Sequence, residues 1–303
     1  MTEPHSSNLR RFKRVAKAIL PPVILSAYRR VQAGFRDAEP AESEYLPGGW
    51  PEKSPSIRGW DYQSVVDAHL APWPDFRAGA QSTAPFALSR EPGGANEVNC
   101  GLHNAIMSFG YVLARATERR TRLSMLDWEG GVGDHYVYAR ALLPDLDPDY
   151  HCRELPLLAK GGRLVLPEAT FHTDDETAFA RHYDFVMASS SIQHVRDWRA
   201  TLKRLATVTD GYMYLTRVPV VEHAPSYVVL QRPDTRGYET EYPGWFLNRD
   251  EFLSATAGLG LTLLREFLIW ERPVVPNAPE AADLRGFLFS ATGRRATSPA
   301  GGS

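Results

Sequence analysis

The sequence has little cysteine and no long hydrophobic run. Cys100 and Cys152 are the two cysteines among 303 residues, and neither belongs to a cluster with zinc-ligand spacing. Two thiols in a chain of this length indicate a reducing compartment rather than a disulfide framework. No segment reaches the roughly 18 apolar residues that a membrane-spanning helix needs, and residues 19–25 are interrupted by Pro21 and Pro22. We therefore expect a cytoplasmic protein without a metal site.

The chain also lacks an excess of charge of either sign. Lys and Arg number 34 against 36 Asp and Glu, a formal charge of −2, which argues against a nucleic-acid partner. Hydrophobic residues at 43% and charged residues at 23% are typical of a globular protein. The length allows one large α/β domain with an appendage.

Positive charge is nevertheless concentrated near the start of the chain. Residues 8–33 hold seven Lys and Arg side chains, interspersed with apolar residues at helical spacing. The pattern predicts two short amphipathic helices joined at Pro21-Pro22. Such a basic arm either packs on the protein itself, which we favour, or makes a peripheral membrane contact with anionic lipid.

Beyond residue 60 the pattern predicts helices followed by an alternation of strands and helices. Early helices are expected over 61–76 and 99–117, and later ones over 135–143, 197–208 and 249–257. A single helical turn is expected at 157–160. Strands are expected at 122–128, 150–155, 169–172, 183–189 and 211–218. The late strands 261–270 and 286–291 are expected to pair antiparallel at the sheet edge. The aromatic run at 242–247 is expected to be a loop, either a lid or an anchor.

This alternation indicates a Rossmann-like, doubly wound and mostly parallel sheet with a helical N-terminal extension. We divide the chain into four parts: a basic helical arm and linker (1–60), a helical cap (61–120), a Rossmann-like domain (121–295) and a disordered tail (296–303).

The most informative segment is a glycine-rich turn after the first strand of this alternation. Asp127 ends the apolar part of the strand, and Glu129, Gly130, Gly131 and Gly133 follow. In doubly wound sheets such a turn lies at the carboxyl ends of the strands, where ligands bind. Glycine permits a close approach of ligand to backbone. The alternative is a turn that needs glycine for its conformation alone.

Dinucleotide binding is disfavoured by the spacing. The G-x-G-x-x-G pattern requires a glycine where Tyr136 stands. A bulky residue there obstructs the tight contact between helix and sheet that lies beneath a bound pyrophosphate. The chain has no G-x-x-x-x-G-K-[ST] phosphate loop either.

An acid follows the next predicted strand. Glu154, next to Leu155, lies 21 residues beyond Gly133, where a carboxylate can accept hydrogen bonds from both ribose hydroxyls of a nucleotide. By itself Glu154 is more often an ordinary exposed glutamate. Its spacing from the glycine turn favours the binding role.

Two more strand ends carry polar residues. Asp174 and Asp175 follow the strand at 169–172; either can bind an adenine amino group, or serve as a helix N-cap. Ser189 and Ser190 end the buried strand at 183–189, which places small hydroxyl side chains at the same edge of the sheet.

Taken together, the glycine turn at 126–133, Glu154 and the segment 183–194 resemble class I S-adenosylmethionine-dependent methyltransferases. More narrowly, the chain resembles an uncharacterised bacterial methyltransferase family that shares an early Leu-Pro-Pro helix, a Gly–Trp segment such as Gly59-Trp60, and a Ser-Ser-x-x-Gln-His turn. The similarity spans about residues 15–270. It implies S-adenosylmethionine as cofactor and a small-molecule or saccharide acceptor.

The chain departs from that family pattern at one position. Glu129 stands where the first glycine of the usual turn belongs. It either pairs with the methionyl ammonium group of the cofactor or narrows the pocket. The second alternative would suit a catalytically degenerate protein that binds cofactor or acts as a scaffold.

Two residues are candidates for chemistry. His194 follows the strand at 183–189 and is our candidate general base for a hydroxyl acceptor, because its ordinary pKa lies near neutrality; the alternative is a structural histidine. Arg217, at the end of the strand at 211–218, is a candidate for binding an anionic acceptor, or else a solvated charge.

Overall fold

The computed structural model describes residues 42–52, 57, 59–86, 97–118, 120–233 and 237–291. The basic segment 8–33 and the tail 296–303 lie outside these residues. The predictions of an amphipathic arm, of its membrane contact and of a disordered tail therefore stay predictions.

The main sheet is mostly parallel. Its parallel strands are β2 (Arg122–Trp128), β3 (Asp147–Arg153), β4 (Thr170–His172), β5 (Tyr183–Ser189) and β6 (Thr209–Val221). They lie in the order β4-β3-β2-β5-β6, and β10 (Asp283–Ser290) and β9 (Thr262–Leu268) continue the sheet antiparallel beyond β6. The predicted parallel α/β sheet with late antiparallel strands is confirmed. Strand order reverses between β2 and β5, which makes their carboxyl ends the expected ligand site.

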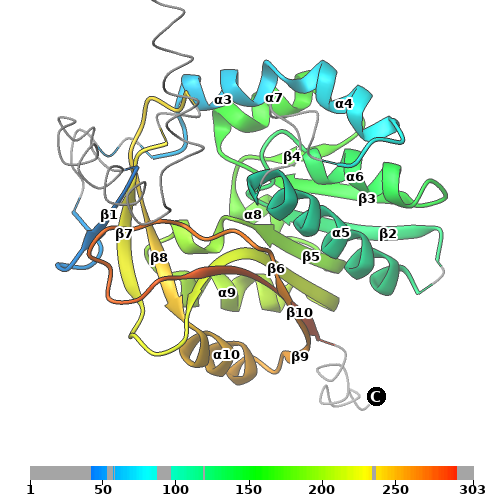
Figure 1. Ribbon diagram of the computed structural model, residues 1–303. Helices are drawn as coiled ribbons and strands as arrows, with labels where there is room; N and C mark the ends of the chain where they lie inside the picture. Colours follow the sequence, from blue (N-terminus) through cyan, green and yellow to red (C-terminus); the bar gives the residue numbers. More distant parts are fainter. Residues whose placement is uncertain are drawn as a thin grey trace, which may run out of the picture. The chain divides into compact units, whose positions relative to one another are not determined.

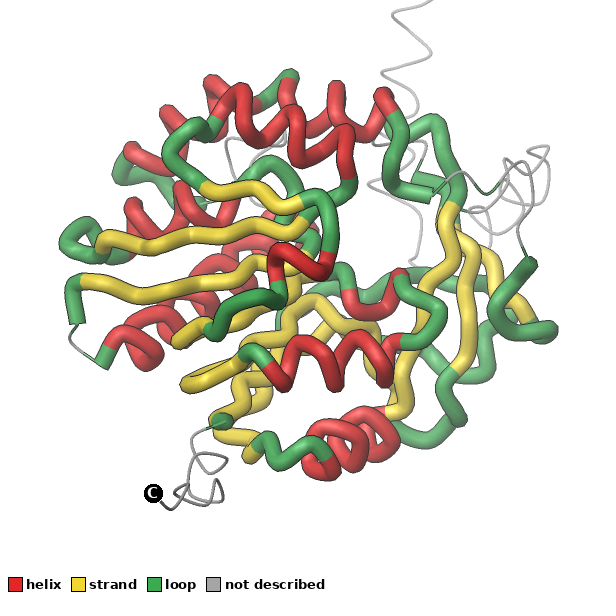
Figure 2. Tube along the Cα trace, turned by 180° about the vertical axis from the view of Figure 1, so that it is seen from behind, coloured by secondary structure: helices red, strands yellow, loops and turns green. Residues whose placement is uncertain are grey.

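Helices cover both faces of this sheet, as Figures 1 and 2 show. One face carries α3 (Gln63–Leu70), α4 (Trp73–Gln81), α5 (Glu97–Thr117), α6 (Asp134–Leu142) and α7 (Pro156–Val165). The other carries α8 (Asp175–Ala178), α9 (Trp198–Thr207) and α10 (Arg249–Gly258).

Strand residues alternate between the two cores. In β5, Phe185 and Met187 pack under the first group of helices, whereas Val186 and Ala188 pack under the second. Because both faces of the sheet are buried, most of the strand's sequence is a continuous apolar run, as is typical of parallel sheets.

The predicted helix over 61–76 is two helices. The helix is interrupted at Pro72, which directly precedes α4. Proline has no backbone N–H to donate the hydrogen bond that a continuous helix needs. The short helical turn predicted at 157–160 is in fact the full helix α7, whose central Gly161 and Gly162 weaken the helical pattern in the sequence.

A second, smaller sheet continues from the end of β6. It contains β1 (Ser43–Leu46), β7 (Tyr227–Gln231) and β8 (Tyr242–Asn248), paired antiparallel, and β8 runs parallel to the last residues of β6. β1 lies in the segment predicted as a linker. The prediction that 242–247 is a loop is wrong, because β8 is mostly buried between β6 and β7. Its Pro243-Gly244 pair is unusual within a strand, so the sequence does not show the typical strand pattern.

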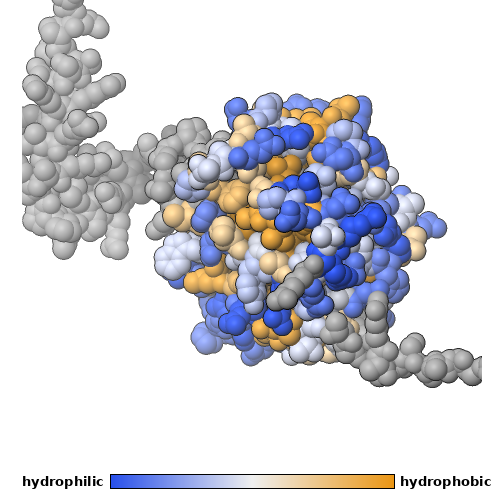
Figure 3. Space-filling model, turned by 90° about the vertical axis from the view of Figure 1, so that its right-hand side faces the viewer, coloured by the Kyte–Doolittle hydropathy of each residue, from blue (hydrophilic) through white to orange (hydrophobic). Residues whose placement is uncertain are grey.

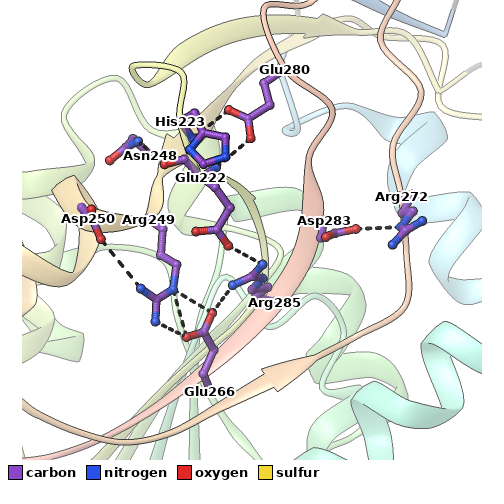
Figure 4. A network of polar contacts seen from close by, with 10 residues as sticks. All are labelled: Glu222, His223, Asn248, Arg249, Asp250, Glu266, Arg272, Glu280, Asp283 and Arg285. Carbon is purple, nitrogen blue, oxygen red and sulfur yellow. Dashed lines mark hydrogen bonds and ion pairs between the residues drawn. The ribbon is translucent and has the colours of Figure 1, made fainter.

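Ion pairs join α10, β9 and β10 to the loop after β6 (Figure 4). Glu266 of β9 accepts from Arg249 at 2.7 Å and from Arg285 at 2.6 Å, and Arg285 also donates to Glu222. Burial raises the pKa of Glu266, but the hydrogen bonds from the two arginines outweigh it and leave that pKa below its ordinary value. Glu280 accepts from three successive backbone N–H groups of the loop.

Some apolar side chains reach the surface, as the orange areas among hydrophilic ones in Figure 3 show. The exposed ones include Met107 and Tyr111 of α5 and Leu263, Leu264 and Leu268 of β9. Within the part of the chain that the structure describes, β9 pairs only with β10, and charged residues between its leucines hinder pairing with another chain. No helix in the described segments is both long and apolar enough to cross a membrane.

The close approach of β5 and β6 depends on Gly211. A Cβ atom at this position would lie 2.5 Å from the backbone oxygen of Asp184, which cannot move without breaking the strand pairing. We expect Gly211→Ala to lower the free energy of unfolding by about 1–3 kcal/mol, measured by urea denaturation. Gly258→Ala is the matched control, because a Cβ there meets no atom within 4 Å. Equal stability of the two variants would contradict the expectation.

Candidate functional site

A cavity lies at the carboxyl ends of β2, β3 and β5 and beside the middle of β6, beneath α3 and α5. Nine of the residues that the sequence predicted for the site line it: Glu129, Gly130, Gly131, Glu154, Leu155, Ser189, Ser190, His194 and Arg217. The structure thus gathers residues that lie up to 88 positions apart in the sequence.

Three of these residues have left-handed backbone conformations although they are not glycine. The φ angles are 55° at Glu129, 54° at Ser190 and 54° at Arg217, on β2, β5 and β6 or directly after them. Such conformations cost about 1–3 kcal/mol each and concentrate at functional sites. Their occurrence around one cavity marks it as the candidate site.

At Arg217 the cause of this conformation is a β-bulge. Arg285 pairs with Val218 and Phe287 pairs with Leu215, so two residues of β6 lie opposite a single residue of β10. A bulge of this kind bends the strand and redirects a side chain. It brings Arg217 to the wall of the cavity.

Glu154 ties the end of β3 to the glycine turn. Its carboxylate accepts from the backbone N–H of Gly131 at 2.9 Å and from that of Leu155 at 2.5 Å. Burial, and then the nearby Glu129, raise the pKa of Glu154 to about 8, although the two N–H groups favour the charged form. Each carboxylate oxygen has a second lone pair, so both can accept a further hydrogen bond from a ligand.

Glu129 lines the cavity while an arginine holds its side chain. Arg153 donates to Glu129 at 3.3 Å and pairs with Asp175 at 2.6 Å. Burial raises the pKa of Glu129 to about 7, against the lowering effect of Arg153. The left-handed φ at Glu129 shows that the turn keeps the backbone shape usual for glycine although the residue carries a side chain.

Asp127 lies beneath the turn and is fully buried. Its carboxylate contacts Nδ1 of His135 at 2.9 Å and accepts from the hydroxyl of Tyr150 at 2.6 Å. His135 itself lines the cavity. Asp127 therefore orients a cavity residue and joins β2 to α6 and β3.

The remaining predicted residues have other contacts. Gly133, with φ of 97°, is the N-cap residue of α6. Asp174 caps α8 by accepting from the N–H of Thr177 at 2.7 Å, and Asp175 pairs with Arg153 and Arg204. Neither aspartate is among the described residues that line the cavity, so their assignment to an adenine group stays a prediction.

A second cavity opens directly beside the first. The two share Trp60, Ser190, His194 and Arg217. The second cavity extends from these residues toward the small sheet and toward the segment before β10, which contributes Glu271. The four shared residues form the junction of the two cavities.

His194 is held in one orientation at this junction. Its Nδ1 lies 3.2 Å from the backbone oxygen of Pro243. A carbonyl oxygen can only accept, so Nδ1 carries the proton and Nε2 keeps its lone pair. Burial lowers the pKa of His194 to about 4, and the Pro243 bond opposes this only in part. The imidazole is therefore neutral at neutral pH, and it is a weaker base than the ordinary histidine pKa used in the sequence-based prediction implies.

Further residues at the site are hard to predict from the sequence pattern. Trp60 stacks on Tyr242, with ring centroids 4.1 Å apart, and its centroid lies 5.2 Å from that of His194. His69 of α3 and Tyr238 also line the first cavity. Of these, Trp60 belongs to the Gly59-Trp60 segment of the family resemblance, and Tyr242 belongs to the aromatic run predicted as a lid or an anchor. The others come from elements whose contacts with the sheet the sequence pattern does not reveal.

The Asp127–His135 pair predicts a pH-dependent contribution to stability. Burial lowers the pKa of His135. The Asp127 carboxylate raises it by a larger amount, so the pKa of His135 lies above its ordinary value. The pair therefore stabilises the fold at pH values below the ordinary histidine pKa, and this contribution is lost as pH rises through the raised value. We expect Asp127→Asn to lower the free energy of unfolding more at about pH 6 than at about pH 9.

The measurement is urea denaturation at both pH values. Asp145→Asn is the control, because Asp145 is exposed and should show no such difference. A loss for Asp127→Asn that is the same at both pH values would contradict the stabilising role of the charged pair.

Comparison with known proteins identifies the family. A family model described as a methyltransferase domain matches residues 106–264, more than half of the chain. No curated protein sequence matches the chain.

Among solved structures, the magnesium protoporphyrin IX methyltransferase of Synechocystis PCC 6803 with bound SAM is 14% identical, covers 72% of this chain and 96% of its own, and has a TM-score of 0.44. The 1,6-didemethyltoxoflavin-N1-methyltransferase of Burkholderia thailandensis is 12% identical, covers 82% of this chain and 99% of its own, and has a TM-score of 0.45. The chain belongs to the methyltransferase-domain family, and its identification as a class I S-adenosylmethionine-dependent methyltransferase is confirmed.

Proposed function

We propose that this S-adenosylmethionine-dependent methyltransferase methylates a hydroxyl group of a small-molecule or saccharide acceptor. The observation that carries the proposal is the position of His194. It lies where the cofactor cavity and the second cavity meet, as a neutral imidazole whose Nε2 has a lone pair. A hydroxyl needs such a base because it must lose a proton as it is methylated.

The residues of the first cavity fit the cofactor. Glu154 has two lone pairs for the ribose hydroxyls beyond the bonds it makes to Gly131 and Leu155. Gly131, with φ of 66°, has no side chain between its backbone and the cavity, so a ligand can approach the main chain closely. The Glu129 carboxylate is the partner we assign to the methionyl ammonium group. Asp174 or Asp175, outside the lining of this cavity, is the candidate for the adenine amino group.

When bound, S-adenosylmethionine supplies a methyl carbon whose bond to sulfur breaks, with both electrons kept by sulfur, as the acceptor oxygen bonds to that carbon. Nε2 of His194 takes the proton that this oxygen loses. Trp60 and Tyr242 pack against the imidazole ring and keep it at the junction. Fixing acceptor and base in this way removes much of the entropic barrier to reaction.

A degenerate protein that binds cofactor without turnover is the second candidate, because Glu129 occupies a glycine position in the turn.

For either candidate we propose a small-molecule or saccharide partner and no nucleic-acid partner. The free thiols of Cys100 and Cys152 support a cytoplasmic location.

Calorimetric titration with S-adenosylhomocysteine tests the cofactor site. We expect micromolar binding, because a buried carboxylate and a backbone turn are already arranged for a nucleoside. Glu154→Ala should abolish binding, since no other group replaces its two hydrogen-bond acceptors. Glu176→Ala, at an exposed position in α8, is the matched control, and NAD should not bind. Absence of S-adenosylhomocysteine binding to the unaltered protein would overturn the assignment.

Replacing Glu129 by glycine separates the two roles considered for this side chain, which are pairing with the methionyl ammonium group and obstruction of the pocket. Glycine adopts the observed φ of 55° at no cost, and Arg153 keeps its ion pair with Asp175, so the turn should stay folded. We expect S-adenosylmethionine to bind at least about tenfold more weakly, a loss of about 1.4 kcal/mol, because the ammonium group loses its partner. Tighter binding by the same calorimetric measurement would show instead that Glu129 obstructs the pocket.

A further inference from the structure

We propose that the second cavity binds a neutral ring that carries adjacent hydroxyl groups, a cyclic polyol or saccharide, and that Arg217 and Glu271 together bind two of those hydroxyls. This inference rests on the proposed function for the methyl donor. It goes further by naming the chemical class of the acceptor and the residues that select it.

Buried polar atoms with no partner mark the binding groups. Gln193 is 4% exposed, and its amide nitrogen donates to Ser190 and to the backbone oxygen of Arg217. Within the described parts of the chain, Oε1 of Gln193, Oε1 of Glu271 and Nε of Arg217 are buried without a hydrogen-bond partner. All three residues line the second cavity. Buried polar groups of this kind are normally satisfied, so a ligand that completes their bonds is favoured there.

The charges of the cavity select a neutral ligand. Arg217 donates to Glu271 at 2.7 Å, so the two charges compensate each other. Arg272 of the lining is paired with Asp283 at 2.8 Å. With Glu42 as the remaining carboxylate, the lining holds two arginines and two glutamates. The earlier hypothesis that Arg217 binds an anionic acceptor is therefore not the one we retain. A hydroxyl both donates and accepts, so one hydroxyl of the ring can accept from Arg217 Nε while its neighbour donates to Glu271 Oε1.

The backbone holds both members of this pair in place. Arg217 lies in the bulge of β6, and Trp270, just before Glu271, is also left-handed with φ of 66°. On α5, a Cβ atom at Gly101 would lie 2.6 Å from Cγ of Glu271, so the helix leaves room for this side chain only because the residue is glycine. Such preorganisation lowers the cost of binding.

Aromatic rings supply the apolar part of the cavity. Trp60, Tyr242, Phe246 and Trp270 line it, and Trp270 is 52% exposed. A saturated ring presents C–H groups that pack on aromatic faces by dispersion. Hydroxyls held by Arg217 and Glu271 then leave a further hydroxyl of the same ring to reach His194 at the junction.

The test is ligand-observed saturation-transfer NMR on the protein saturated with S-adenosylhomocysteine. The probes are the methyl glycosides of glucose, mannose and rhamnose, myo-inositol, and glucuronate as the anionic comparison. We expect saturation transfer to at least one neutral probe and a weaker signal for glucuronate.

Two variants assign the signal to the cavity. Glu271→Gln should reduce binding of the neutral probe at least about tenfold and increase that of glucuronate, because the charge of Arg217 is then uncompensated. Glu44→Gln is the matched control: Glu44 also pairs with an arginine at 2.7 Å but is outside the residues that line the cavity. Trp270→Ala removes an exposed ring without opening the core and should also weaken binding.

The outcomes separate this inference from the proposed function. If S-adenosylhomocysteine binds and no neutral probe does, or if glucuronate binds better than all of them, the inference is overturned and the proposed function stands. If Glu271→Gln and Trp270→Ala both bind S-adenosylhomocysteine and the probe like the unaltered protein, the assignment to this cavity is wrong. If S-adenosylhomocysteine itself does not bind, the proposed function fails as well.

Discussion

The site depends on one backbone constraint, which is that three neighbouring strands carry a left-handed non-glycine residue at the same edge of the sheet. At Glu129, Ser190 and Arg217 the backbone adopts the left-handed conformation although each residue carries a side chain. Glycine would satisfy the backbone at lower cost. The surrounding sheet and helices must therefore hold these residues, and what is gained is a ring of polar side chains around one cavity.

Electrostatics at this edge follows from burial. Glu129 and Glu154 are both buried, and each has another carboxyl group nearby. Burial, and to a smaller extent the neighbouring acid, raises the pKa of both. Backbone N–H groups and Arg153 offset only part of that effect. A ligand with positive charge beside the two carboxyls favours their ionised forms, which is in keeping with a sulfonium cofactor. On the other side of the junction, Arg217 and Glu271 compensate each other.

The sequence was most informative where local pattern and topology agree. The strands at 122–128 and 183–189 were predicted with the bounds that the structure shows, because continuous apolar runs between turns are typical of central parallel strands. Glu154 was found through its spacing from the glycine turn. By contrast, Trp60, Tyr238 and Glu271 reach the site through contacts between distant segments. The strand β8 was missed because it gains its partners from β7 and from the end of β6.

The small sheet has a consequence for the order in which the molecule folds. Its edge strand β1 pairs with β7, joining residues 43–46 to 228–231, which lie more than 180 positions apart in the sequence. The entropy lost in closing so long a loop is recovered only after the intervening strands have formed. We therefore expect the part of the molecule around the first cavity to assemble earlier, from contacts nearer in sequence. The wall of the second cavity to which Ser43 of β1 belongs is then completed last, when β1 docks on β7.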